Sequence, residues 1–325
     1  MVKYRWALFC ALIIVVFSFF LFSFSDSSKE SNLFKALKFQ NAVSPVIIPE
    51  YMQFAGENVP LNNFDTRESL ERELIVNTYW HSQSLILLKR AKRYFPVIEP
   101  ILKKYNIPDD FKYMAVAESG LAQVVSPSQA VGIWQLKEGT AKDYGLEVNE
   151  TVDERYHIEK STEAACKFMN KSYSLFNNWA LAAASYNGGR RFIKEQMEQQ
   201  KQSSYYDLLL GEETERYVFR MIALKLIFEN PEDYGFVTGN EGYEPIPYNE
   251  KVISVSIDDF GQFALDNNTN YKMLKMLNPW LRKPYLKIPA NKSYKIKIPE
   301  PGFRQINIPD TSLVIDTLIL TDTIN

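Results

Sequence analysis

The sequence predicts a mainly α-helical chain that ends in a small α+β module. Apolar residues recur at helical spacing among charged residues over residues 67–235, and proline or glycine closes most of these runs. Two segments near the C-terminus alternate as strands do. At roughly 150 residues per domain, 325 residues allow about two domains, and 46% hydrophobic content supplies a core. A chain that is disordered throughout is therefore excluded.

The charge and the cysteine content exclude several classes of function. Lysine and arginine number 37 against 39 aspartate and glutamate, a net charge of −2, so no nucleic-acid partner is expected. Cys10 lies in an apolar N-terminal segment and Cys166 far from it, which excludes a disulfide framework and a cysteine-ligated zinc site. His81 and His157 are far apart and no acidic cluster has ligand spacing, so neither a metal nor a cofactor is expected.

A long apolar segment follows the first charged residues of the chain. Between residues 6 and 24 only two serines are not apolar, and the length is close to the ~20 residues that cross a bilayer. Lys3 and Arg5 before it predict a cytoplasmic N-terminus, with the rest of the chain beyond the membrane. We therefore expect residues 1–25 to be a membrane anchor. The Ser-Phe-Ser sequence at 23–25 leaves open the alternative of a cleaved signal peptide.

A spacer and a helical domain are expected to follow. Residues 26–66 mix serine, asparagine and lysine with three prolines, which predicts a spacer with patches of order. The apolar positions of 67–95 then predict one long amphipathic helix that ends at Pro96.

The next helices have clear start and stop signals. Asp109 and Asp110 are expected to cap a helix that stops at Gly120. Helical spacing predicts further helices at 159–176, 179–186, 190–199 and 213–228.

After Gly239 the pattern changes from helical spacing to alternation. Strands are expected at 252–256 and 294–298, with short helices at 258–265 and 271–277 between them, which gives a β-α-α-β module. The predicted parts of the chain, from anchor or signal peptide through spacer, helical domain and module to tail, are residues 1–25, 26–66, 67–238, 239–300 and 301–325.

Glu118 is the residue most indicative of chemistry. It closes a predicted helix on the same face as Phe111, Met114 and Ala115. An apolar surround and the negative end of the helix dipole both favour the protonated carboxyl, which a general acid needs near neutral pH. Taken alone, a glutamate in the last turn of a helix is ordinarily a solvated side chain.

Three further segments carry aromatic rings, and the first two also carry an amide side chain. They are Gly-Ile-Trp-Gln at 132–135, Tyr-Asn-Gly-Gly at 186–189 and Thr-Glu-Arg-Tyr-Val at 214–218. Aromatic and amide groups suit sugar rings, which have apolar faces edged with hydroxyls. Each segment also has an ordinary explanation: Trp134 as core, Asn187 as part of a helix cap and Tyr217 as packing.

Together and in this order, these segments resemble the motifs of the lytic transglycosylase family, in particular the membrane-bound murein transglycosylase D type. The resemblance covers about residues 67–235 and departs from the family pattern only in small changes at Ile133 and Ser185. The four motifs are Glu118-Ser119, Gly132-Ile133-Trp134-Gln135, Ser185-Tyr186-Asn187 and Tyr217.

The resemblance implies a lysozyme-like helical fold that cuts peptidoglycan glycan strands between N-acetylmuramic acid and N-acetylglucosamine. Glu118 would protonate the glycosidic oxygen and then accept the proton of the muramic acid's primary hydroxyl, giving an anhydromuramic end without consuming water. Ordinary glycosidases need a second carboxylate. The acids noted beside these motifs, Glu138 and Asp143, have no role by family analogy.

The resemblance also implies roles for the other motif residues. Ser119 and Tyr186 would orient Glu118, and Tyr217 would line the cleft beside it. Gln135 and Asn187 would hydrogen-bond the acetamido and hydroxyl groups of the sugars.

The C-terminal module resembles a peptidoglycan-binding LysM repeat. The resemblance lies in the order of its elements and in Leu-Asn-Pro at 277–279, but Ser-Ile-Asp at 256–258 replaces the usual Gly-Asp-Thr. Glycan binding and a purely packing role both remain open for this degenerate LysM-like module.

We therefore expect a cell-envelope enzyme whose partners are peptidoglycan strands and, through its N-terminal segment, the membrane. It would be anchored to the inner membrane facing the periplasm, or exported after signal cleavage. Two alternatives remain: a hydrolytic muramidase of goose-lysozyme type, and a scaffold that binds murein without cutting it. The acid at Glu118 argues against the scaffold, because binding alone does not require a partly buried acid.

Overall fold

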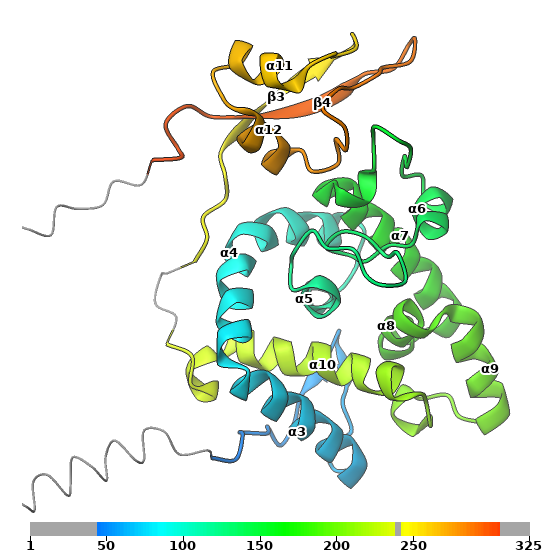
Figure 1. The fold of residues 1–325 in the computed structure, drawn as a ribbon. Helices are drawn as coiled ribbons and strands as arrows, with labels where there is room; N and C mark the ends of the chain where they lie inside the picture. Colours follow the sequence, from blue (N-terminus) through cyan, green and yellow to red (C-terminus); the bar gives the residue numbers. More distant parts are fainter. Residues whose placement is uncertain (1–43, 238–241, 306–325) are drawn as a thin grey trace, which may run out of the picture. The chain divides into compact units, whose positions relative to one another are not determined.

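The computed structural model describes residues 44–237 and 242–305 of the chain (Figure 1). The predicted membrane segment at 1–25 lies outside the described residues, as do most of the tail and the N-terminal part of the predicted spacer. Within the described ranges, no helix has both the length and the apolar character needed to span a bilayer.

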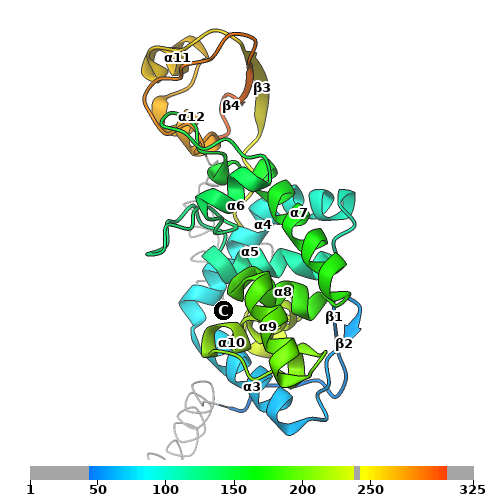
Figure 2. The ribbon, with the colours of Figure 1, turned by 90° about the vertical axis from the view of Figure 1, so that its right-hand side faces the viewer.

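A helical domain forms around α5, which α4 and α10 contact directly (Figures 1 and 2). The α-helices are α3 (Phe64–Tyr79), α4 (His81–Lys104), α5 (Lys112–Ser119), α6 (Glu138–Asp143), α7 (Ile158–Phe176), α8 (Trp179–Gly188), α9 (Arg190–Gln200) and α10 (Glu212–Glu229). Short 3-10 helices are η1 (Asp109–Phe111), η2 (Glu154–Tyr156), η3 (Tyr205–Asp207) and η4 (Pro231–Tyr234). The helices predicted within residues 159–228 are confirmed, with ends that differ by one or two residues.

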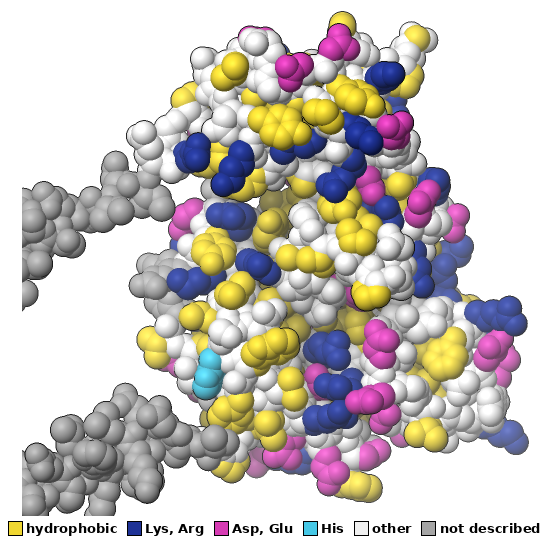
Figure 3. All heavy atoms as spheres, in the orientation of Figure 1, with side chains coloured by type: hydrophobic (Ala, Val, Ile, Leu, Met, Phe, Trp, Pro, Cys, Tyr) yellow, Lys and Arg dark blue, Asp and Glu magenta, His cyan; other side chains and the backbone are white. Residues whose placement is uncertain are grey.

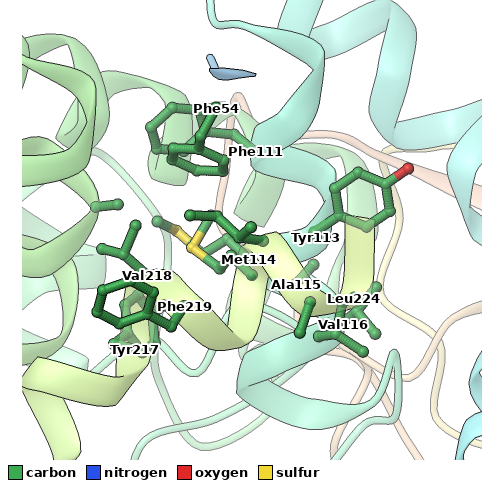
Figure 4. Packing of buried hydrophobic residues seen from close by; sticks show 14 of the residues in the cluster. Phe54, Phe111, Tyr113, Met114, Ala115, Val116, Tyr217, Val218, Phe219 and Leu224 are labelled. Atoms are coloured by element: carbon green, nitrogen blue, oxygen red, sulfur yellow. The ribbon is translucent and has the colours of Figure 1, made fainter. Parts of the chain in front are cut away.

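The core joins α5 to α10. Met114 of α5 points toward Val218 of α10, and both side chains are fully buried (Figure 4). Phe111 lies at the other end of this cluster with its ring centroid 5.8 Å from that of Phe54. This packing fixes the two helices that carry the first and last motifs.

The prediction of one long helix ending at Pro96 is wrong. The chain forms two helices that meet at Trp80, and the second, α4, continues through Pro96 and Pro100 to Lys104. Each proline removes one helical hydrogen bond, and α4 bends along its length (Figure 1). The helix nevertheless continues because one face stays in the core, at Leu87, Ala91, Ile98 and Leu102.

The predicted spacer also differs from the structure in its C-terminal part. A small antiparallel hairpin, β1 (Gln53–Phe54) and β2 (Glu57–Asn58), precedes α3. Its neighbours enter the core rather than solvent; the buried residues are Met52, Phe54, Val59 and Leu61. The Glu57 carboxylate accepts the backbone N–H of Trp179 at 2.6 Å, which satisfies the start of α8.

The start of α5 is also not as predicted. Asp109 and Asp110 make no cap; they form η1, and the carboxylate of Asp110 instead accepts the N–H of Ala55 at 2.7 Å and pairs with Lys225 at 2.6 Å. The predicted stop is confirmed, because Gly120 adopts a left-handed φ of 60° directly after α5. Glu118 therefore lies in the last turn of its helix.

The C-terminal module has the predicted order of elements. It consists of β3 (Tyr248–Ile253), α11 (Phe260–Asp266), α12 (Tyr271–Leu277) and β4 (Tyr294–Pro299), with β3 and β4 antiparallel. The first strand begins at Tyr248 rather than at 252, and Val255 is 74% exposed. Alternation identifies a strand but does not fix its register, which is set here by pairing with β4.

The module packs against the segments on either side of α6. Val131 and Val152 of the helical domain share a hydrophobic cluster with Trp280 and Leu281 of the module. The backbone N–H of Asp153 donates to the Trp280 carbonyl at 2.9 Å. A packing role is therefore present in the structure, and glycan binding by the module stays a prediction.

Candidate active site

The Glu118 carboxyl meets Tyr217 between α5 and α10. The Tyr217 hydroxyl donates to Glu118 Oε1 at 2.5 Å, and the tyrosine side chain is only 2% exposed. Burial raises the pKa of the Tyr217 phenol well above its ordinary value, so this group stays a hydrogen-bond donor. The first and fourth motifs, 99 positions apart, are thus brought into direct contact.

Burial also raises the pKa of Glu118 to about 7. The Tyr217 hydrogen bond opposes this shift, since it favours the charged form. Two charged residues of α10 act in opposite directions: Glu213 raises the pKa of Glu118 and Arg220 lowers it. A carboxyl with a pKa of about 7 can give up a proton and take one back near neutral pH, as an acid that later serves as a base must.

The loop at 132–135 is held from two helices. The Ser119 hydroxyl of α5 donates to the Ile133 carbonyl at 2.8 Å, and the Tyr186 hydroxyl of α8 donates to the Trp134 carbonyl at 2.6 Å. Within the described part of the chain, neither hydroxyl bonds to Glu118. Tyr217 is the residue that hydrogen-bonds Glu118, whereas Ser119 and Tyr186 bond the loop beside it. The expected role of Ser119 and Tyr186 in orienting the acid stays a prediction.

Two residues of the loop itself have unequal access to a ligand. The Trp134 ring is completely buried and its Nε1 donates to the Thr162 hydroxyl at 2.8 Å, so this ring is core. The Gln135 amide nitrogen donates to the carbonyls of Gly132 at 2.7 Å and Val124 at 3.1 Å. Among the described residues no donor reaches the Gln135 side-chain oxygen, which is left to accept from a ligand.

Asn187 links α8 to α10. Its Nδ2 donates to Glu213 at 3.1 Å, and its Oδ1 accepts from the Thr214 hydroxyl at 2.8 Å. Sequence reasoning missed Glu213 as a second acid beside the motifs. The available signal was its position four residues before Tyr217, which places both side chains on one face of α10.

A close backbone contact fixes the start of the loop. Gly132 has a φ of 83°, and a Cβ built on it would lie 2.2 Å from the Arg155 carbonyl oxygen. Arg155 is itself buried, and its guanidinium donates two hydrogen bonds to the Asp153 carboxylate, at 2.9 and 2.7 Å. Only glycine fits this position without moving the 153–155 segment.

No metal-binding cluster of three or more histidine, cysteine or acidic side chains occurs in residues 44–237 and 242–305.

Two family models match the chain. Residues 96–209 match the family described as "Transglycosylase SLT domain", and residues 249–302 match the "Soluble lytic transglycosylase C-terminal LysM-like domain". The chain therefore contains an SLT transglycosylase domain followed by a LysM-like domain. The predicted fold class, a lysozyme-like helical domain with a small LysM-like module, is confirmed.

Individual proteins are similar to parts of the chain. The chain is 31% identical over 191 residues to the membrane-bound lytic murein transglycosylase D of Escherichia coli K12, which covers 56% of this chain and 41% of that protein. A putative tributyltin chloride resistance protein of an Alteromonas species is 32% identical over 102 residues, 31% of this chain and 49% of its own. The 70 kDa soluble lytic transglycosylase of Escherichia coli aligns with 47% of this chain and 27% of its own, at 18% identity and a TM-score of 0.38. The chain thus spans about two fifths of the length of transglycosylase D.

Replacing Gly132 should damage the site. Gly132→Ala introduces a Cβ 2.2 Å from the Arg155 carbonyl oxygen at a left-handed φ, and we expect destabilisation by about 1–3 kcal/mol with displacement of the loop. Thermal melting and glycan cleavage measure the two effects. Gly139→Ala is the matched control: nothing lies within 4 Å of its added Cβ, so it should leave the melting temperature unchanged or raise it. Equal melting temperatures for both variants would contradict this account of the loop.

Removing the Tyr217 hydroxyl should shift the pH dependence of activity. That hydrogen bond lowers the pKa of Glu118, so Tyr217→Phe raises it further and moves the alkaline limb of the rate profile to higher pH. The rate below that limb falls because the acid is no longer held. The control is Tyr113→Phe, which removes the hydroxyl of a buried tyrosine on α5. This variant should leave the alkaline limb in place. A limb unmoved by Tyr217→Phe would show that Glu118 does not set it.

Proposed function

We propose that this protein is a peptidoglycan lytic transglycosylase that cleaves the bond between N-acetylmuramic acid and N-acetylglucosamine. The observation that carries the proposal is the partly exposed Glu118, with a pKa of about 7 and a hydrogen bond from a buried tyrosine. It occurs in a chain homologous to a membrane-bound lytic murein transglycosylase. Peptidoglycan is therefore the substrate class, and the cell envelope is its location.

The reaction divides into two proton transfers at Glu118. In the first, the protonated carboxyl donates to the glycosidic oxygen as the bond from that oxygen to C1 of the muramic acid breaks. In the second, the resulting carboxylate accepts the proton of the C6 hydroxyl as O6 bonds to C1. The product is a 1,6-anhydromuramic end, and no water is consumed. The Tyr217 hydroxyl stabilises the carboxylate between the two transfers.

Other residues would bind or position the sugars. The free side-chain oxygen of Gln135 is an acceptor for an acetamido N–H or a hydroxyl, while Ser119 and Tyr186 keep its loop next to α5. Asn187 already bonds Glu213 and Thr214, which leaves it one amide hydrogen for a sugar.

A hydrolytic muramidase is the second candidate, because Glu213 supplies another carboxylate close enough to affect Glu118. Such an enzyme would use the second acid to activate water and would leave reducing ends rather than anhydro ends. We favour the first reaction because Glu213 is engaged by the Asn187 amide at 3.1 Å.

Substitution of the acid tests the proposed function. Glu118→Gln should abolish release of anhydromuropeptides from purified sacculi, measured by mass spectrometry, because an amide cannot transfer the proton. Glu138→Gln, an exposed acid of α6 paired with Lys142, should keep full activity.

The variant should also remain folded. A carboxyl whose pKa is raised on folding favours the folded state below its unfolded pKa and loses that contribution as pH rises through about 7. Glu118→Gln should therefore melt no lower than the wild type at pH 8. Cleavage by the folded variant at a comparable rate would refute the assignment, and reducing ends from the wild type would establish the muramidase.

We also propose that residues 1–25 anchor the protein in the inner membrane, with the enzyme on the periplasmic side. The support is the apolar stretch at 6–24, close to the ~20 residues of a bilayer span. Fractionation should recover the full chain in the membrane pellet and a variant lacking residues 1–25 in the soluble fraction. A soluble wild-type chain that begins near Asp26 would identify a cleaved signal peptide instead.

A further inference from the structure

Arg220 lies on the face of α10 that meets the acid. Positions 213, 217 and 220 are spaced three or four residues apart and share one side of the helix. Tyr217 on this face bonds Glu118, and the charges of Glu213 and Arg220 both act on that carboxyl. Arg220 therefore belongs to the same site, one helical turn beyond the tyrosine.

A buried carboxylate of α3 holds Arg220 from behind. Glu73 is 1% exposed; its Oε1 accepts from Arg216 Nε at 2.6 Å, and its Oε2 lies 3.5 Å from Arg220 Nε. Two guanidinium groups compensate the burial of this one carboxylate. Both α3 and α10 lie outside residues 96–209, so the family match does not include this cluster.

The donors of Arg220 are largely unused. A guanidinium has five N–H donors in a planar fork. In the described part of the chain, the ion pair of Arg220 Nε with Glu73 is its one close polar contact, and its two terminal nitrogens bond nothing. Its neighbour Arg216 bonds Glu73 and also Glu212, at 3.2 Å. The Arg220 side chain is 30% exposed, so part of it is accessible from the surface.

Charged side chains also lie on the surface of α10 and α3. Lysine and arginine side chains gather next to acidic ones over α10 and α3 (Figure 3). Arg72 and Arg216 on this surface are both paired with Glu212. A free planar fork beside paired charges suits a carboxylate, which accepts two parallel N–H bonds from it.

We propose that Arg220 binds a carboxylate of the peptide arm carried by the muramic acid next to the cleaved bond. This rests on the proposed function, because muramic acid carries its lactyl-peptide arm at the sugar that Glu118 attacks. The sugar rings offer only hydroxyl and acetamido groups, so the peptide arm is where substrate anions lie. Arg220 would thus make the enzyme select glycan whose peptides keep their carboxylates.

A coupled effect on the acid follows. The positive charge of Arg220 lowers the pKa of Glu118, and a substrate carboxylate bound to the guanidinium offsets that charge. Glu118 then stays protonated to higher pH when carboxylate-bearing substrate is bound.

The test compares two forms of one substrate. Cleavage is measured on soluble glycan strands with intact peptides and, in parallel, on the same strands whose peptide carboxylates have been converted to methylamides. For the wild type we expect KM to be about tenfold lower on the carboxylate form, the size of one charge-assisted hydrogen bond. We also expect the alkaline limb of kcat to lie at higher pH with that form.

Three variants of the full chain complete the experiment. Arg220→Gln should remove the KM difference between the substrates, and Arg220→Lys should restore part of it, since lysine keeps the charge but not the fork. Arg72→Gln, whose arginine is already bonded to Glu212, should keep the full difference. Thermal melting of each variant identifies any that fails to fold, in which case the lysine variant and the two substrates still decide.

The outcomes separate the two proposals. A wild type that releases no anhydro ends from either substrate contradicts the proposed function. A wild type that cleaves both forms with equal KM contradicts the role of Arg220 in binding. So does an Arg220→Gln variant that loses kcat equally on both substrates at unchanged KM, which would mean that Arg220 acts only on Glu118.

Discussion

The site depends on one hydrogen bond, from the Tyr217 hydroxyl to the Glu118 carboxyl. Each group is costly to bury alone: the carboxyl resists ionisation there, and the phenol needs an acceptor. The hydrogen bond gives the phenol its acceptor and holds the carboxyl in place. The placement of α10 against α5 therefore sets both the geometry of the acid and its pKa. The packing of Met114 on Val218 holds α5 and α10 together so that this hydrogen bond can form (Figure 4).

A second constraint is the position of the short loop at 132–135, which lies beside α5 and makes no hydrogen bond to the Glu118 carboxyl among the described residues. Ser119 and Tyr186 hold two of its carbonyls, and Gly132 lies against the backbone of Arg155. The C-terminal module contacts the segment around Arg155, through the Val152 side chain and the backbone of Asp153. The module and the loop therefore share one support, and a change in how the module packs would reach the loop through a few residues.

Local sequence signals were sufficient to predict an element's end where the conformation of a single residue determines it. Gly120 ends α5 because it adopts a left-handed φ at no steric cost, and the sequence alone predicted this stop. Local signals were misleading where tertiary contacts dominate. Pro96 does not end α4, because the helix face on either side of it remains buried, and Asp110 is drawn away from capping by Ala55 and Lys225.

The sequence by itself determined the helices between residues 158 and 229, the order of elements in the C-terminal module, the order of the four motifs and the place of Glu118 at the end of an apolar helix face. Only the tertiary structure decided which group bonds the acid, Tyr217 rather than Ser119 or Tyr186, and that Glu73 of α3 stands behind Arg220. The physical reason is one of range. Helical periodicity fixes which side chains share a face, whereas contacts between distant helices depend on their packing angle and rotation, which the whole core sets and no local pattern contains.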